Sequence, residues 1–413
     1  MAKARLASVR RTAHAALPRV FPAVDLPTVD AVVARDRPAE PLLCLRPAVV
    51  EAAAARFVAS FPGDVLYAVK CNPEPRVLRA VWAGGVRHFD CASLPEVALV
   101  RCELPPAEVH FMHPVKSRPA ICAAFHQYGV TDFVLDSCDE LEKILQETVP
   151  VGLVGTPPTL GLLVRLAVAQ GGAYDLSGKF GAPVDEVSAL LRAARPHAAR
   201  LGICFHVGSQ CLDPQAYARA IRLAAEAVAL AEVDIDIVDV GGGFAVSYPD
   251  YTPPALGDYM DGIRETAAAS FGAGVRLWAE PGRALVAGGG SVVVQVQLRR
   301  GDALYVNDGV YGSLSDAGGP GFRFPVRRIA PDRAEARDTP VRPFSLFGPT
   351  CDSADHMQGP FLLPADIDEG DWIELGQLGA YGACLRTAFN GFATLLTAEV
   401  CDPAMLATPD YED

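Results

Sequence analysis

The sequence has no long apolar run, although half of its residues are hydrophobic. No uninterrupted stretch reaches the roughly 18 to 20 apolar residues that a helix needs to cross a bilayer. The first 24 residues contain five Lys or Arg and no acidic residue, but no apolar secretory core follows them. We therefore expect no membrane partner, and a basic N-terminal helix packed on the body; an organelle transit peptide is the alternative.

Paired cysteines are also missing. The eleven cysteines are odd in number, none lies in a CxxC pair, and most are set in apolar segments such as 42–44 and 203–205. Disulfide frameworks and zinc sites need regularly spaced cysteines. We therefore predict free thiols in a reducing compartment, a cytoplasmic location and no metal site.

Clustered positive charge is absent after residue 20, and the formal net charge is -13. Nucleic-acid phosphates are bound by clustered Lys and Arg, so this balance argues against nucleic acid as a partner. An acidic surface is compatible with a cationic small molecule as the ligand.

The 413 residues are too many for one ordinary core and fit two domains, one of them a barrel of roughly 250 residues. Short β-branched runs alternate with segments of helical spacing, such as 213–230. This alternation is typical of βα units and a parallel sheet. Eight such runs occur, the number that closes a barrel: 65–69, 88–90, 109–112, 132–135, 162–166, 203–207, 235–239 and 275–279.

The pattern changes after about residue 288. Residues 291–298 partly alternate between apolar and polar, and turns and prolines become frequent while helical stretches disappear. Residues 41–45 have the pattern of a strand that could pair with this region. The predicted fold is α/β: a (β/α)8 barrel over 46–287 and an all-β domain over 288–413, to which the N-terminal segment 1–45 contributes.

Polar residues fall where the predicted barrel strands end, and the loops at those ends build the working face of such barrels. Lys70 follows a buried strand, where a charged amine is costly to desolvate and its pKa is depressed. A Schiff base with an aldehyde cofactor uses such a lysine; a lysine that emerges into solvent is the alternative. The other strand-end residues are Asp90, Arg165, His206, Ser209, Gly241, Gly242, Gly243, Glu280 and Arg283.

Several of these residues suit a phosphorylated pyridine. The glycine triplet 241–243 either exposes backbone N–H groups to a phosphate or makes a tight turn, and Ser209 either adds a hydroxyl donor or caps a helix. Glu280 either keeps a pyridine nitrogen protonated or braces a loop by pairing with Arg283. By strand alternation His206 points into the barrel, against a cofactor ring or as a packing residue.

Three loops of the C-terminal region also carry chemically active groups: 307–313, 348–353 and 379–381. The second contains a thiol, Cys351, beside a carboxylate, Asp352. Cysteine normally seeks apolar burial, so a thiol in a polar loop points to chemistry rather than to core packing.

Together these motifs resemble those of eukaryotic-type ornithine decarboxylases, in the ornithine, diaminopimelate and arginine decarboxylase family with the alanine-racemase-like fold. The resemblance implies an enzyme that depends on pyridoxal 5'-phosphate and decarboxylates a basic amino acid. Seven segments follow the family's order over about 325 residues: 67–72, 205–210, 239–244, 280–283, 307–313, 348–352 and 379–392.

The resemblance also implies a role for each matching residue. Lys70 would be the Schiff-base lysine, Glu280 the partner of the pyridine nitrogen, and His206 the imidazole stacked on the ring. In a homodimer with shared active sites, Cys351 of the partner subunit would protonate the carbanion, and Asp352 of the partner subunit would face the distal amine. The phosphate would be bound by Ser209, Gly242, Gly243, Gly282, Arg283 and Tyr381, with Asp90 and Arg165 supporting the pocket.

One position departs from the family. Ornithine decarboxylases of this type carry a second acidic residue about a dozen positions after the Asn-Asp-Gly motif, where this sequence has Gly-Gly-Pro-Gly at 318–321. Asp316 lies about four residues too early, and a distal ammonium needs a carboxylate partner. The candidate substrate contacts are therefore Tyr311, Asp316 and Asp352.

The substrate expected from Cys351-Asp352 is L-ornithine, converted to putrescine in polyamine biosynthesis, because diaminopimelate enzymes usually have Cys-Glu there. Lysine, a D-amino acid and diaminopimelate are the other candidate substrates. A racemase on the same fold and a catalytically silent regulatory homologue are the other candidate functions.

Overall fold

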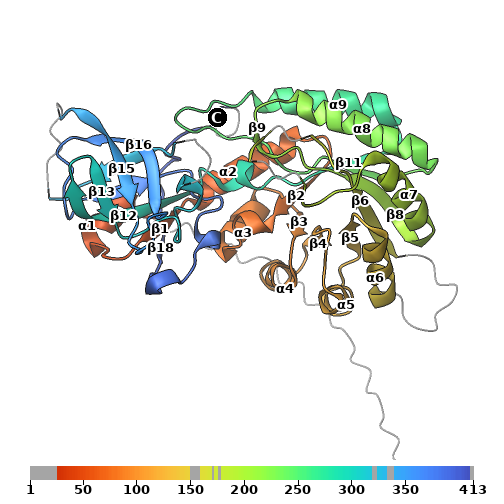
Figure 1. Ribbon diagram of the computed structural model, residues 1–413, viewed down its shortest axis with the longest axis horizontal. Helices are drawn as coiled ribbons and strands as arrows, with labels where there is room; N and C mark the ends of the chain where they lie inside the picture. The colour runs from red at the N-terminus through yellow and green to blue at the C-terminus, as the bar shows by residue number, and fades with distance from the viewer. Residues whose placement is uncertain are drawn as a thin grey trace, which may run out of the picture.

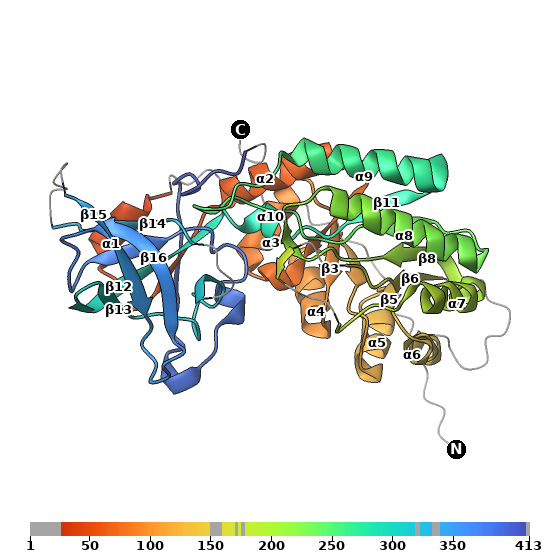
Figure 2. The same ribbon diagram turned by 45° about the horizontal axis from the view of Figure 1, so that its top comes forward.

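The computed structural model describes residues 26–148, 159–169, 172–174, 178–318, 323–332 and 339–409. The helix expected in the first 24 residues lies outside these ranges. Figures 1 and 2 show a barrel and a sheet domain side by side. Within the described ranges, no helix combines the length and the apolar character required to span a bilayer.

Eight parallel strands close the barrel in the order β10-β11-β2-β3-β4-β5-β6-β8, which confirms the predicted fold. Each strand overlaps one of the eight predicted runs. Their bounds are β2 (Asp64–Ala68), β3 (His88–Cys91), β4 (Glu108–Phe111), β5 (Asp132–Leu135), β6 (Leu160–Arg165), β8 (Ala198–Cys204), β10 (Ile237–Asp239) and β11 (Arg276–Ala279).

The prediction for the sixth strand was wrong in its bounds. β8 begins at Ala198, five residues before the predicted start, and ends at Cys204, so His206 follows the strand instead of lying within it. The first residues of β8, Ala-Ala-Arg-Leu-Gly, contain no β-branched side chain, although they pair with β6 from Ala198 onward. The alternation argument for the direction of His206 therefore fails.

Helices surround the barrel (Figure 2). α8 shows the cause: Ala220, Ala224, Ala227 and Ala231 recur every three or four residues and are buried, so one apolar stripe faces the strands. The bounds are α2 (Pro47–Ser60), α3 (Pro75–Ala83), α4 (Leu94–Glu103), α5 (Arg118–His126), α6 (Cys138–Thr148), α7 (Val184–Ala194), α8 (Gln215–Ala231), α9 (Leu256–Phe271) and α10 (Arg283–Val286).

The second domain is an eight-stranded sheet built from both parts of the chain. β1 pairs antiparallel with β12 and parallel with β18, which confirms that the N-terminal segment contributes a strand. α1 (Val29–Asp36) buries Val29, Val32 and Val33 against this sheet. The strands are β1 (Leu42–Leu45), β12 (Gly290–Arg300), β13 (Ala303–Val306), β14 (Val326–Ile329), β15 (Val341–Phe347), β16 (His356–Pro364), β17 (Trp372–Leu375) and β18 (Leu396–Glu399).

Hydrogen bonds join the sheet domain to the mouth of the barrel. The N–H of Tyr381 donates to the carbonyl of Cys71 at 3.0 Å, and Asn72 Nδ2 donates to the carbonyl of Gly379 at 2.7 Å. Cys71 ends a 3-10 turn, η1 (Val69–Cys71), directly after β2. The loop after β17 therefore delivers Tyr381 to the C-terminal end of the barrel strands.

Candidate active site

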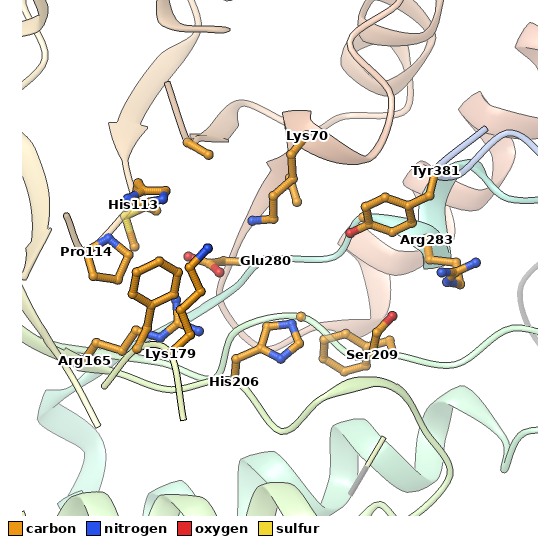
Figure 3. Close-up of a pocket in the computed structure, with 18 residues that line it drawn as sticks. Lys70, His113, Pro114, Arg165, Lys179, His206, Ser209, Glu280, Arg283 and Tyr381 are labelled. Atoms are coloured by element: carbon orange, nitrogen blue, oxygen red, sulfur yellow. The ribbon is translucent and has the colours of Figure 1, made fainter. Parts of the chain in front are cut away.

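A cavity of about 420 Å³ lies at the C-terminal ends of the barrel strands (Figure 3). It brings together ten residues predicted from the sequence, from segments more than 300 positions apart. These ten are Lys70, Arg165, His206, Ser209, Gly242, Gly243, Glu280, Gly282, Arg283 and Tyr381.

Lys70 extends into this cavity from η1. Its Nζ donates to Asp90 Oδ2 at 2.6 Å, and 44% of the side chain is accessible because it faces the cavity, whereas Asp90 is buried in β3. Burial disfavours the charged amine, but the carboxylates of Asp90 and Glu280 outweigh it and raise the pKa of Lys70. The expected depression of this pKa was wrong, because a buried carboxylate pairs with the amine.

Glu280 presents its carboxyl group beside two other acids. Burial, and then the negative charges of Asp239 and Asp90, raise the pKa of Glu280 well above its usual range. Burial also raises the pKa of Asp239 to about 6, and the side chains of Asp239 and Glu280 share a hydrogen bond. A cationic N–H group placed against Glu280 would relieve this crowding of carboxylates.

The glycines after β10 allow close backbone packing at the other end of the cavity. A Cβ on Gly242 would lie 2.6 Å from the carbonyl oxygen of Glu280, and one on Gly243 would lie 2.4 Å from that of Gly208. Gly243 also has φ +101°, which L side chains rarely adopt. Gly241 does not line the cavity; its N–H donates to Asp239 Oδ1 at 2.8 Å within the turn.

Arg283 supplies positive charge at this glycine-rich end, where Figure 3 shows it near Tyr381 and Ser209. Its guanidinium donates to Asp316 Oδ2 and to the Tyr248 hydroxyl, both at 2.6 Å, and lies 5.0 Å from the centroid of the Tyr381 ring. A cationic side chain, a hydroxyl and closely approachable backbone form a cradle for a phosphate.

His206 lies between the carboxyl end and the glycine end of the cavity (Figure 3). Its Nδ1 accepts the N–H of Gly208 at 3.0 Å, which leaves the proton of the neutral ring on Nε2. Burial, and then the charges of Arg165 and Lys70, lower the pKa of His206 to about 3. The imidazole is therefore neutral at physiological pH, and it suits contact with a flat aromatic ring.

Comparison with known proteins decides the family. The family model described as "Pyridoxal-dependent decarboxylase, pyridoxal binding domain" matches residues 48–287, which is the barrel with most of the cavity residues. The chain belongs to this family of decarboxylases. Its residues fit pyridoxal phosphate: Lys70 for the aldehyde, Glu280 for the pyridine nitrogen, and the cradle at Gly243 and Arg283 for the phosphate.

Relatives of this decarboxylase cover most of its length. It is 32% identical to the ornithine decarboxylase of Schizosaccharomyces pombe, over 79% of this chain and 76% of that protein. It is also 32% identical to the lysine/ornithine decarboxylase of Selenomonas ruminantium, over 79% and 81%. The structure of the Paramecium bursaria Chlorella virus arginine decarboxylase bound to agmatine superposes with a TM-score of 0.79 at 28% identity, covering 90% of this chain and 99% of that one.

Besides Asp90 and Gly241, four predicted residues do not line the cavity of the decarboxylase. Cys351 is exposed, and its N–H donates to Asn390 Oδ1 at 3.1 Å. Tyr311 donates its hydroxyl to Asp352, on the same outer face of the sheet domain. Asp316 lies behind Arg283 with 5% of its side chain exposed. Within one chain, the candidate proton donor and distal contacts therefore do not line the cavity.

Several cavity residues were missed by the sequence analysis. His113 and Pro114 lie shortly after the end of β4, so the strand-end rule that found Asp90 could have found them. Lys179 and Phe180 also line the cavity, but they end no barrel strand and so gave no such signal. Asp239 does not line the cavity but adjoins Glu280; the sequence analysis placed it in a predicted strand and in the motif 239–244 and gave it no role of its own.

Proposed function

We propose that the enzyme converts L-ornithine to putrescine and carbon dioxide, as a homodimer with shared active sites. The observation that carries this proposal is the convergence of Lys70, Glu280 and Arg283 on one cavity of a decarboxylase fold. The named relatives act on ornithine, lysine or arginine, all basic amino acids. Cys351-Asp352 follows the ornithine pattern, which supports the choice of ornithine.

Bound pyridoxal phosphate supplies an electron sink for the pair left when carbon dioxide departs. Lys70 Nζ would hold the aldehyde of the cofactor, and Asp90 Oδ2, 2.6 Å away, orients Nζ and would accept its proton. Glu280 would keep a proton on the pyridine nitrogen, and His206 would support the ring as a neutral imidazole. Arg283, Gly243 and Ser209 would bind the phosphate and so orient the scissile bond.

The dimer is needed because the proton donor lies outside the cavity. Cys351 is exposed, and its N–H donates to Asn390, which lies in the chain between two exposed aromatic residues. Phe389 is 41% and Phe392 is 45% exposed, and both line one hollow with Tyr311. Exposed aromatic side chains gathered in this way mark an interaction surface. A second copy placed here would bring Cys351 of the partner subunit to the substrate carbon, where its Sγ delivers a proton, and Asp352 of the partner subunit to the distal amine.

Carbon dioxide release over a panel of basic amino acids tests the reaction. Ornithine is expected to give the highest kcat/KM, followed by lysine and arginine. No release from any diamino acid or from arginine would reject the proposed function.

Mixing two inactive variants tests the shared site. Lys70→Ala and Cys351→Ala proteins lose activity separately, but half of the randomly mixed dimers would contain one intact site. The mixture should recover about a quarter of the wild-type activity. Equal activity of the mixture and of the separate variants would reject the partner's contribution.

We further propose a cytoplasmic location. All eleven cysteines are free, and they include exposed ones such as Cys102 and Cys401. Exposed thiols persist in a reducing compartment. Fractionation of cells that produce the protein tests this, and recovery from an oxidising compartment would reject it.

A further inference from the structure

A second cavity lies beside the active site. It measures about 390 Å³ and is formed by the loops after β3 and β4 and by the first residues of α4 and α5. It reaches solvent at Val115, which is 54% exposed. The two cavities share two lining residues, Ala92 and His113. The wall between them therefore consists in part of one methyl group and one imidazole ring.

The imidazole of His113 is held in a defined orientation. Its Nδ1 accepts the N–H of Val115 at 3.1 Å, and its ring packs edge-to-face on Phe180 with the centroids 5.1 Å apart. Burial, together with the charges of Lys116 and Lys179, lowers the pKa of His113. The ring is therefore a neutral, flat obstacle at physiological pH.

A buried lysine, Lys116, holds the loop that carries His113. Lys116 Nζ donates to the carbonyl of His113 at 2.9 Å and to that of Val134 at 2.6 Å, and it pairs with Glu140 at 2.9 Å. The side chains of Lys116 and Glu140 are 0% and 2% exposed. These contacts hold the backbone of the loop and so fix the point from which the His113 ring extends.

Charged side chains of the same chain provide little discrimination between basic substrates at this side of the cavity. Among the described residues that line the active-site cavity, Glu280 is the only carboxylate, and it would pair with the pyridine nitrogen of the cofactor. Figure 3 shows His113 and Pro114 on the side toward which the Lys70 amine points, away from Arg283 and Ser209. A substrate amine that took the place of the Lys70 amine would lie on this side, and the substrate side chain would then have this wall as a neighbour.

We propose that His113 is a specificity-determining residue, whose ring limits the length of the amino-acid side chain by closing the active site against the second cavity. This inference rests on the proposed decarboxylase function. Loss of the ring would join spaces of about 420 and 390 Å³. A longer basic side chain, such as that of arginine, would then fit without displacing the loop.

Substitutions at His113 test the proposal through substrate ratios. In His113→Ala, the ratio of kcat/KM for arginine to that for ornithine should rise by about tenfold or more, the scale on which shape discriminates in pockets. His113→Phe keeps a flat ring and should leave the ratio within about twofold of wild type. Should His113→Ala not retain the cofactor absorbance, His113→Asn replaces it, with a smaller rise of about threefold expected.

Ala120 provides a matched control, because it lines only the second cavity. Ala120→Phe alone should leave the wild-type ratio unchanged, and combined with His113→Ala it should cancel the rise. An unchanged ratio in a His113 variant that binds cofactor normally would overturn the proposal, as would a rise that Ala120→Phe does not affect. Wild-type protein that decarboxylates no basic amino acid would instead refute the proposed function itself.

Discussion

Replacement of Asp316 by asparagine separates a phosphate-site role from a substrate contact. Asp316 and Arg283 are 5% and 4% exposed, and their charged atoms are 2.6 Å apart. Removal of one partner from a buried ion pair costs about 3 to 5 kcal/mol, since the other charge remains buried. Asp316→Asn should therefore lower the unfolding free energy of the cofactor-free protein by about this amount.

The cofactor should reverse part of this loss. Its phosphate places a negative charge beside Arg283 and so compensates the guanidinium in the variant. If the loss of unfolding free energy caused by Asp316→Asn is smaller by about 1.4 kcal/mol in the cofactor-bound protein than in the cofactor-free protein, the variant binds pyridoxal phosphate about tenfold more tightly than wild type. Denaturant unfolding of both forms, with titration of the cofactor by absorbance, measures the two quantities.

Glu374→Gln is the matched control. Glu374 is fully buried in the sheet domain, where it pairs with Arg46 at 2.6 Å, and neither side chain lines the cavity. Its substitution should destabilise the free and loaded forms equally. Equal losses in both forms of Asp316→Asn, or weaker cofactor binding, would refute the reasoning. A raised KM for ornithine with unchanged cofactor affinity would support a substrate contact instead.

Three further outcomes follow from the geometry. His206 takes up a proton below pH about 6.5 in the unfolded state but only near pH 3 in the folded state, so acidification favours unfolding over this range. Between pH 7 and 4, the unfolding free energy of His206→Asn should therefore fall by about 2 to 3 kcal/mol less than that of wild type. Gly243→Ala forces a side chain into φ +101° and toward the Gly208 carbonyl, which should weaken cofactor binding by about tenfold or more in absorbance titrations. Glu140→Gln removes the carboxylate that pairs with Lys116. Because burial lowers the pKa of Lys116 to about 8, this lysine is charged at pH 7 and largely neutral at pH 9, and the loss of thermal stability should be larger at pH 7. Equal losses at the two pH values would refute this.

The barrel was predictable because its evidence is local. Most of the parallel strands are buried on both faces and appear as short runs rich in apolar residues, and polar residues at the strand ends mark the working face. From that rule alone we predicted that Lys70, Arg165 and Glu280 lie together, and all three line one cavity. Where a strand begins with residues of low β-propensity, as β8 does at Ala198, the same rule misplaces the strand and hence His206.

The pKa shifts and buried ion pairs were not predictable from the sequence, because they depend on which residues far apart in the sequence come into contact. The raised pKa of Lys70 comes from Asp90, 20 positions away, and the partner of Arg283 is Asp316, 33 positions away. No local sequence pattern predicts such pairs. The clamp between Lys116 and Glu140 and the position of Lys179 are likewise consequences of the closed barrel.

The central claim is that Lys70 carries the cofactor, and reduction with borohydride tests it most directly. The loaded enzyme is reduced, digested and examined by peptide mass spectrometry, with the unreduced enzyme as the control. The expected result is the mass of reduced pyridoxal phosphate on Lys70 alone, with no such mass in Lys70→Ala. The same mass on Lys179 or Lys116, or on no lysine, would contradict the assignment.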